Sequence, residues 1–368
     1  MMEGPRPVAN SERASLGQLV DQALMGGAEG AMFRGYPTVF NEENSPNCLV
    51  LVDDGRVVTH VGMTQRWASI AGCSVRVACV ASVATDEAYR NRGLASQVFA
   101  AACEKAFAEG VDFMMISGGR SLYRRAGAVD VGRDFIAAID AGAAASLHAR
   151  DIRIDEFVEG DLDACAALYD TRVARFVRPC DDWQWLARSR SVMSRDVDMN
   201  IVRRRDAACG YFITGRDNRE GVTDVLEFAG ENTAIAGALK SLLARRSSRA
   251  VKMRLQQNDF ALKSLFENAG VALTPEKTMG TLLIINFEQL MPRLTPWFEH
   301  RIGMAQAKAL SFKQEGERFL FSDGGNTVAL DRGEAGTAVF GYPEKPLFSG
   351  LLAQVFPAPS LYYGINYV

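Results

Sequence analysis

Hydrophobic and polar positions in the first quarter of the chain predict one helix followed by several strands. Apolar residues at helical spacing indicate an amphipathic helix over 14–25. Two β-branched runs follow, at 48–52 and 56–59, and Asp53-Asp54-Gly55 lies between them. An Asp-Gly pair between such runs is typical of a tight hairpin. A longer β-rich run at 74–85 predicts a third strand.

A turn, a helix and a buried strand come next. The apolar positions after Gly93 fall on one face of a helix that we expect to end at Gly110. They are Val98, Phe99, Ala102, Cys103, Ala106 and Phe107. A strand is expected at 111–117, and then a short helix over 121–128 that ends at a glycine.

Part of this plan recurs 143 residues later. Residues 121–127 read S-L-Y-R-R-A-G, and residues 264–270 read S-L-F-E-N-A-G. The same offset aligns the run 222–228 with the strand 79–85, and it places a helix start near Gly237. In the second copy Arg90, Gly93 and Tyr123 are replaced by Thr233, Ala236 and Phe266. We therefore expect the first copy to contain the active site and the second to have only a structural role.

The last part of the chain has a different pattern of predicted elements. Residues 294–300 have a helical apolar pattern, and short strands are expected at 318–321, 327–330 and 337–340. The aromatic end, 355–368, is expected to dock into the protein rather than hang loose.

Composition excludes several classes of protein. The chain has 368 residues, a net charge of −3, three histidines and seven cysteines. A net negative charge argues against a nucleic-acid binder. The histidines and cysteines are scattered along the sequence, which predicts no metal site. The cysteines are expected to be the reduced thiols of a cytoplasmic protein. We expect neither a secretory signal nor a membrane span.

The segment Arg90-Asn91-Arg92-Gly93-Leu94-Ala95 carries the chemistry. It joins a predicted strand to a predicted helix. Backbone N–H groups at such a turn converge on one concavity, and the helix dipole adds partial positive charge, which suits a pyrophosphate. Gly93 permits close approach, and the two arginines can add charge-assisted hydrogen bonds. The alternative is an ordinary strand-to-helix turn.

Residues 82–96 resemble the GNAT acetyltransferase superfamily, through its R/Q-x-x-G-x-G/A signature in a strand–turn–helix setting. Residues 122–127 fit the tyrosine–glycine element of that superfamily. The whole chain resembles the enhanced intracellular survival type of acetyltransferase. That resemblance implies an α/β fold with mixed sheets: a catalytic GNAT domain at 1–148, a degenerate GNAT-like domain at 149–290 and a small sterol-carrier-like α/β domain at 291–368.

The resemblance also implies roles for single residues. Backbone groups of Val83, Ala84 and Thr85 would pair with the pantetheine arm of acetyl-CoA, and 90–95 would hold its pyrophosphate. Tyr123 would protonate the departing thiolate, and the C-terminal carboxylate of Val368 would act as the base. The alternatives are that Tyr123 is a packing aromatic and that Val368 belongs to a docked terminus without chemistry.

The expected function is transfer of an acetyl group to a primary amine, by direct attack in a ternary complex. The acceptor is a small-molecule amine or a peptide lysine, with no nucleic-acid or membrane partner, and assembly into a homo-oligomer stays open. Alternatives are a non-catalytic acyl-CoA-binding protein, an enzyme for a longer acyl-CoA and a tandem-GNAT ligase-like acyltransferase. The cluster at 181–185, which holds two aspartates and two tryptophans, either lines an acceptor pocket or caps and packs a helix.

Overall fold

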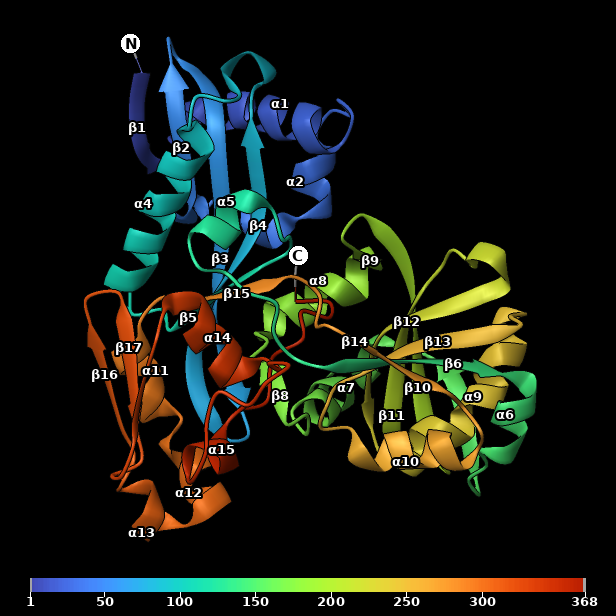
Figure 1. Ribbon diagram of the computed structural model, residues 1–368. Helices are drawn as coiled ribbons and strands as arrows, with labels where there is room; N and C mark the ends of the chain where they lie inside the picture. The colour runs from blue at the N-terminus through green and yellow to red at the C-terminus, as the bar shows by residue number, and fades with distance from the viewer. Residues whose placement is uncertain (1, 367–368) are drawn as a thin grey trace. The chain divides into compact units, whose positions relative to one another are not determined.

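A computed structural model describes residues 2–366 of the chain, which divide into two compact units (Figure 1). The first unit holds residues up to Val131 together with Met279–Ser360. The second unit holds Gly132–Thr278 and Leu361–Asn366. Each unit has its own mixed sheet, as the α/β fold class predicted.

The sheet of the first unit has the strand order β1-β2-β3-β4-β5-β15. All neighbours are antiparallel except β4 and β5, which are parallel. The predicted hairpin is present, and its turn residues Asp54 and Gly55 both have positive φ, at 48° and 77°. The strands are β1 (Met2–Pro7), β2 (Cys48–Asp53), β3 (Arg56–Ile70), β4 (Cys73–Thr85), β5 (Phe113–Ile116) and β15 (Thr281–Ile284).

Helices cover both faces of this sheet. The predicted helices are present as α1 (Arg13–Leu24) and α4 (Leu94–Ala108). Successive residues of a strand point to opposite faces. Leu49 and Leu51 accordingly join the core beneath α4, whereas Val50 joins the core beneath α1. The shorter helices of this half are α2 (Ala31–Gly35), α3 (Pro37–Phe40) and α5 (Ser121–Arg125).

The C-terminal part of the first unit consists of short helices and the three-stranded antiparallel sheet β16-β17-β18. It is joined to the main sheet by Arg293, which donates to the buried Asp112 carboxylate at 2.7 Å, and by the Phe113 and Phe340 rings, 5.1 Å apart. Its elements are α11 (Phe287–Arg293), α12 (Thr295–Ile302), α13 (Met304–Ala307), β16 (Ser311–Glu315), β17 (Arg318–Ser322), β18 (Thr327–Leu330), α14 (Arg332–Phe340) and α15 (Leu352–Val355).

One predicted strand is wrong. Residues 337–340 end the helix α14 instead. Asp331 caps this helix by accepting from the Glu334 N–H at 2.8 Å, and the Glu334 carboxylate accepts from the Asp331 N–H at 2.9 Å. This reciprocal capping box overrides the turn suggested by Glu-Ala-Gly. The helix then buries Ala335, Ala338 and Val339 on one face.

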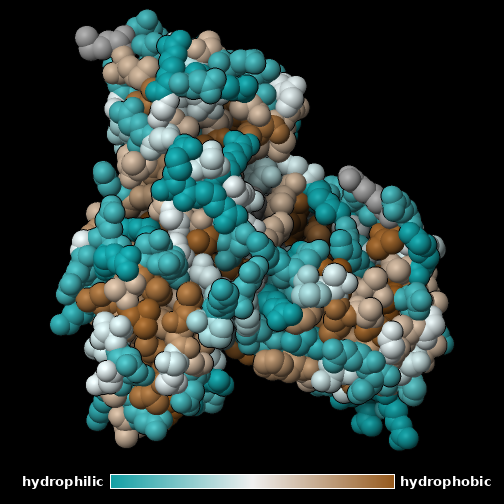
Figure 2. Space-filling model, viewed as in Figure 1, coloured by the Kyte–Doolittle hydropathy of each residue, from teal (hydrophilic) through white to brown (hydrophobic). Residues whose placement is uncertain are grey.

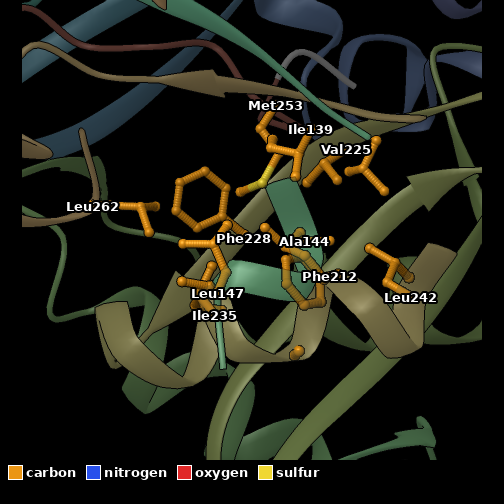
Figure 3. Packing of buried hydrophobic residues seen from close by; sticks show 14 of the residues in the cluster. Ile139, Ala144, Leu147, Phe212, Val225, Phe228, Ile235, Leu242, Met253 and Leu262 are labelled. Carbon is orange, nitrogen blue, oxygen red and sulfur yellow. The ribbon is translucent and has the colours of Figure 1, made fainter. Parts of the chain in front are cut away.

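The sheet of the second unit has the order β14-β6-β13-β12-β11-β10-β7. Its core lies between the sheet and the long helix α9, and Figure 3 shows Phe212, Phe228, Ile235 and Leu262 packed there. The strands of this sheet are β6 (Asp134–Asp140), β7 (Ile152–Glu156), β9 (Ser191–Val192), β10 (Arg195–Arg204), β11 (Ala207–Gly215), β12 (Val222–Gly230), β13 (Ala250–Leu255) and β14 (Leu273–Glu276). The second unit also contains the short strand β8 (Ala174–Phe176), which is not part of this sheet. The helices are α6 (Ala141–Ser146), α7 (Leu162–Tyr169), α8 (Cys180–Ser189), α9 (Asn232–Arg246) and α10 (Phe260–Asn268).

The repeat is present as strand, helix, strand and helix in the same order, but its spacing is not constant. Helix α9 begins at Asn232, five residues before the start that the offset predicted at Gly237. Phe266, the counterpart of Tyr123, is fully buried in the core, as expected of a packing aromatic.

Two strands lie in a different sheet from the one that the predicted domain boundaries imply. Strand β6 pairs with β13 of the second sheet, and β15 pairs with β5 of the first. Residues 291–360 also belong to the first unit. The division into three domains at 148 and 290 therefore stays a prediction from sequence. The structure instead groups the chain into two compact units.

On the face shown in Figure 2, hydrophilic residues predominate, with apolar residues gathered over the C-terminal helices and strands of the first unit. Within residues 2–366, no helix has both the length and the apolar character needed to cross a membrane.

Candidate active site

The two parallel strands at the centre of the first sheet diverge. Strand β5 pairs with β4 only from Val77 to Val80, because β5 ends at Ile116, whereas β4 runs on to Thr85. The register of β4 against β3 also shifts at Ala81, which adds one residue to β4. Such a bulge bends a strand and raises its twist. The end of β4 therefore forms one side of an open V.

The turn after β4 leads into the N-terminus of α4. Asn91 and Gly93 have φ of 62° and 77°, and Gly93 is the N-cap residue. A side chain built at Gly93 would meet no atom within 4 Å, so the space in front of the helix is open. Leu94, Val98 and Phe99 fix the helix in the core. Its free N–H groups and its dipole therefore face an open concavity.

This concavity is part of a cavity of about 610 Å³ within the first unit. Eight of the nine residues predicted to bind the cofactor line it. They are Val83, Ala84, Thr85, Arg90, Asn91, Gly93, Leu94 and Ala95. The ninth, Arg92, does not line it: its guanidinium donates to the Ala88 carbonyl at 2.9 Å and lies 5.0 Å from the Tyr89 ring centre.

The opposite wall was missed by the sequence reasoning. Arg120, Ser121, Leu122 and Arg125, in and just before α5, also line the cavity, as do Ala23 and Leu24 of α1. With Arg90, three arginines line the cavity. The signal for α5 was present in the sequence, because arginines fall at 120, 124 and 125 just after a predicted buried strand. The contribution of α1 had no such signal, since it depends on how the helix crosses the sheet.

Tyr123 lies in the core beside this wall rather than among the residues that line the cavity. Its side chain is 5% exposed, and its ring lies 5.3 Å from that of Phe99. Burial raises the pKa of the Tyr123 hydroxyl, with a smaller opposing effect of Arg120. The phenol therefore keeps its proton at neutral pH. Val368, the predicted base, lies outside the described residues.

A buried histidine lies behind the end of β4. His60 Nδ1 is 3.2 Å from the Leu49 carbonyl oxygen, so Nδ1 carries the proton and Nε2 accepts from the Ser82 hydroxyl at 2.9 Å. Full burial lowers the pKa of His60 to about 3. The imidazole is therefore neutral at physiological pH and supports the strand without carrying a charge.

The equivalent place in the second unit is closed. A Cβ at Gly237, inside α9, would lie 2.7 Å from the backbone nitrogen of Ala149, so the chain at 149 packs closely against this helix. The gap beside β12 is reduced to about 30 Å³, and Tyr362, Gly364 and Asn366 form part of its lining. The second copy therefore has the same order of strands and helices but, within the described residues, no cavity of comparable size beside β12.

The 181–185 cluster is the start of helix α8. Asp181 and Asp182 lie in its first turn, where carboxylates stabilise the helix dipole, and Trp183 is buried. Its ring lies 5.9 Å from that of Tyr169. The interpretation as a helix start with a core tryptophan accounts for these positions.

A mixed sheet whose central parallel strands diverge at the N-terminus of a helix is the framework of a GNAT-type acyltransferase. Residues 6–129 match the family model described as an acetyltransferase (GNAT) domain. The match covers the whole of the cavity described above and marks the chain as an acyltransferase.

Solved structures agree with this fold over most of the chain. A GCN5-related N-acetyltransferase from Kribbella flavida is 16% identical, with a TM-score of 0.67 and 98% of each chain covered. Eis1 from Mycobacterium abscessus is 13% identical, with a TM-score of 0.64 over 92% of this chain and 89% of that one. A GCN5-related N-acetyltransferase from Anabaena variabilis is 14% identical, with a TM-score of 0.63 over 90% and 85%. At these identities the likeness carries the fold alone, and no curated protein sequence matches the chain.

Proposed function

We propose that the chain is an acetyl-CoA-dependent N-acetyltransferase that acts on a primary amine. The observation that carries this proposal is the 610 Å³ cavity, which joins the open end of β4 to the N-terminus of α4. Three arginines around it, Arg90, Arg120 and Arg125, suit the phosphates of a coenzyme A thioester. The backbone of Val83–Thr85 offers edge hydrogen bonds to an amide-containing arm such as pantetheine.

In the proposed reaction the amine nitrogen attacks the thioester carbon, the carbon–sulfur bond breaks, and the sulfur leaves as a thiolate. A backbone N–H near Val83 would stabilise the oxyanion of the tetrahedral intermediate. Tyr123 would give its proton to the thiolate. Burial raises the pKa of this phenol, so it is protonated at neutral pH, although the same shift makes it a weaker acid.

An attacking ammonium must also lose a proton. Its reference pKa is near 10.4, so it is mostly protonated at neutral pH. We keep the carboxylate of Val368 as the proposed base. The acceptor is either a small-molecule amine or a peptide lysine.

The remaining expectations belong to the same proposal. The small sheet β16-β17-β18 with its short helices supports the likeness of 291–368 to a sterol-carrier fold. The seven cysteines are free thiols, which supports a cytoplasmic location.

One observation favours a second function, the binding of acyl-CoA without turnover. Tyr123 is packed against Phe99 and is not among the residues that line the cavity. A buried packing aromatic would serve a binding protein equally well.

The deciding experiment is a coenzyme A release assay over a panel of amines and lysine peptides, with mass spectrometry of the products. The proposed function requires release that depends on the amine and a product heavier by one acetyl group. Calorimetric binding of acetyl-CoA without any release would establish the second function instead.

A further inference from the structure

The second unit holds the chain's own C-terminal segment in the cleft that corresponds to the cofactor site of the first unit. Strand β12 pairs with β13 in parallel only from Val222 to Val225, as β4 does with β5, and then runs on to Gly230. The cleft beside Leu226 and Glu227 is lined by three residues of the segment 361–366. What is a cavity in the first unit is therefore an occupied groove in the second.

Alternate residues of the segment 361–366 face the core and the cleft. Leu361, Tyr363 and Ile365 are buried, at 2%, 1% and 4% exposure, while the residues between them line the cleft. Gly364 has φ of +52°, and a Cβ there would lie 3.1 Å from a carboxylate oxygen of Glu227. Both the backbone conformation and the close approach to this carboxylate favour a glycine here.

Arg178 is the centre of the contact. Its side chain is 3% exposed and forms an ion pair with Glu227, with nitrogen–oxygen distances of 3.1 and 2.8 Å. Its guanidinium also lies 4.1 Å and 4.2 Å from the ring centres of Tyr169 and Trp183. Two further donations, at 3.0 and 2.9 Å, go to the side-chain oxygen of Asn366.

The other half of the Asn366 amide is used as well. Its nitrogen donates to the Tyr169 hydroxyl at 3.1 Å and to the Tyr363 carbonyl at 2.8 Å. Glu227 is held in turn by the Tyr211 hydroxyl, which donates at 2.7 Å. A side chain at 366 must therefore accept from a cation and donate on its other side, which an amide does and a carboxylate or an alkyl group does not.

We propose that Arg178 is a positioning residue, which fastens the segment 361–366 in the cleft of the second unit. The second GNAT-like unit is then a receptor for the chain's own C-terminal segment and not a second acyl-CoA site. A consequence for turnover rests on the proposed function, in which a group beyond Asn366 acts as the base.

The test variant is Asn366→Leu, which is close in shape. It removes every hydrogen bond of the Asn366 side chain and leaves the Arg178–Glu227 pair intact. Asn366→Asp is the partial variant, because it keeps an acceptor for Arg178, but it loses the two donations and turns a carboxylate oxygen towards the Tyr363 carbonyl. Leu242→Val, on the buried side of α9, is the control for a general loss of stability.

Two measurements on the full chain separate anchoring from catalysis. Amide hydrogen exchange follows the N–H of Asn366, which donates to the Tyr363 carbonyl at 2.9 Å. Steady-state kinetics with acetyl-CoA and an amine gives kcat and KM. We expect Asn366→Leu to raise exchange at 366 and lower kcat, each at least tenfold, with the KM for acetyl-CoA within twofold of wild type. Asn366→Asp should recover part of both effects, and Leu242→Val should show neither.

Unchanged exchange in Asn366→Leu would overturn the anchor. Raised exchange with unchanged kcat would overturn the positioning role. If the wild-type chain transfers no acyl group to any amine, the proposed function fails and the positioning role fails with it, while the exchange measurement still decides whether the anchor exists.

Discussion

Substitution of Gly93 tests the electrostatic reasoning about the cavity most directly. Gly93 caps α4 with φ of 77°, a conformation that a side chain makes unfavourable by about 1–2 kcal/mol. No atom lies within 4 Å of a Cβ built there, so the added side chain would enter open space in front of the helix. The backbone strain is common to all substitutions, whereas the charge differs among them.

Gly93→Glu would place a carboxylate where the proposed site holds phosphates. Two like charges about 4 Å apart repel by roughly 4 kcal/mol at an effective dielectric constant of 20, and solvent screening lowers this value. We expect a loss of about 2–4 kcal/mol, which corresponds to a Kd for acetyl-CoA roughly 30- to 1000-fold weaker. Isothermal titration calorimetry measures it on a variant whose circular dichroism confirms folding.

Two matched variants isolate the cause. Gly93→Ala carries the strain without a charge and should bind within a few-fold of wild type. Gly93→Lys carries the strain with a long cationic side chain and should bind much better than Gly93→Glu. Equal affinity in the Glu and Lys variants would refute the electrostatic reasoning, and wild-type affinity in all three would place the phosphates elsewhere.

Three further predictions follow from the same structure. Tyr123→Phe should lower kcat far more than it changes acetyl-CoA affinity, whereas Phe266→Tyr should leave kcat nearly unchanged; equal effects on kcat would mean that the active copy is misassigned. The lowered pKa of His60 stabilises the fold above pH 6.5, and this contribution is lost as pH falls towards 3, so the stability advantage of wild type over His60→Gln should shrink by up to about 1.4 kcal/mol per pH unit in urea titrations below pH 6.5. Burial raises the pKa of Asp112 to about 6, so its contribution is present below pH 4 and lost as pH rises through 6; Asp112→Asn should therefore gain stability relative to wild type over that range, and a constant difference would contradict the assignment.

The sequence predicted the elements that position the site because their signals are local. The Asp54-Gly55 turn, the β-branched run of β4 and the apolar face of α4 are each decided within a few residues. The order of strand, turn and helix then places Arg90 and Gly93 at the cavity without knowledge of the rest of the chain.

What the sequence left undetermined depends on distant partners. Nothing local to Thr281–Ile284 indicates that this strand pairs with β5, and nothing near Arg178 indicates that its partner is Asn366. The side-chain direction of Arg92 is similar, because the Ala88 carbonyl competes with the cavity for its guanidinium. The strand expected at 337–340 failed because the capping box that begins α14 was overlooked.

The pairing of β15 with β5 has a consequence for biosynthesis. Met115 lies opposite Leu282, so the sheet that bears the cavity gains its last strand only after residues 132–278 of the second unit have been synthesised. Contacts between residues so distant in sequence form slowly, whereas chains emerge from the ribosome N-terminus first. All of the second unit except its C-terminal segment is thus synthesised before the sheet of the first unit can be completed. A stalled or truncated product lacking 281–284 would expose the edge of β5.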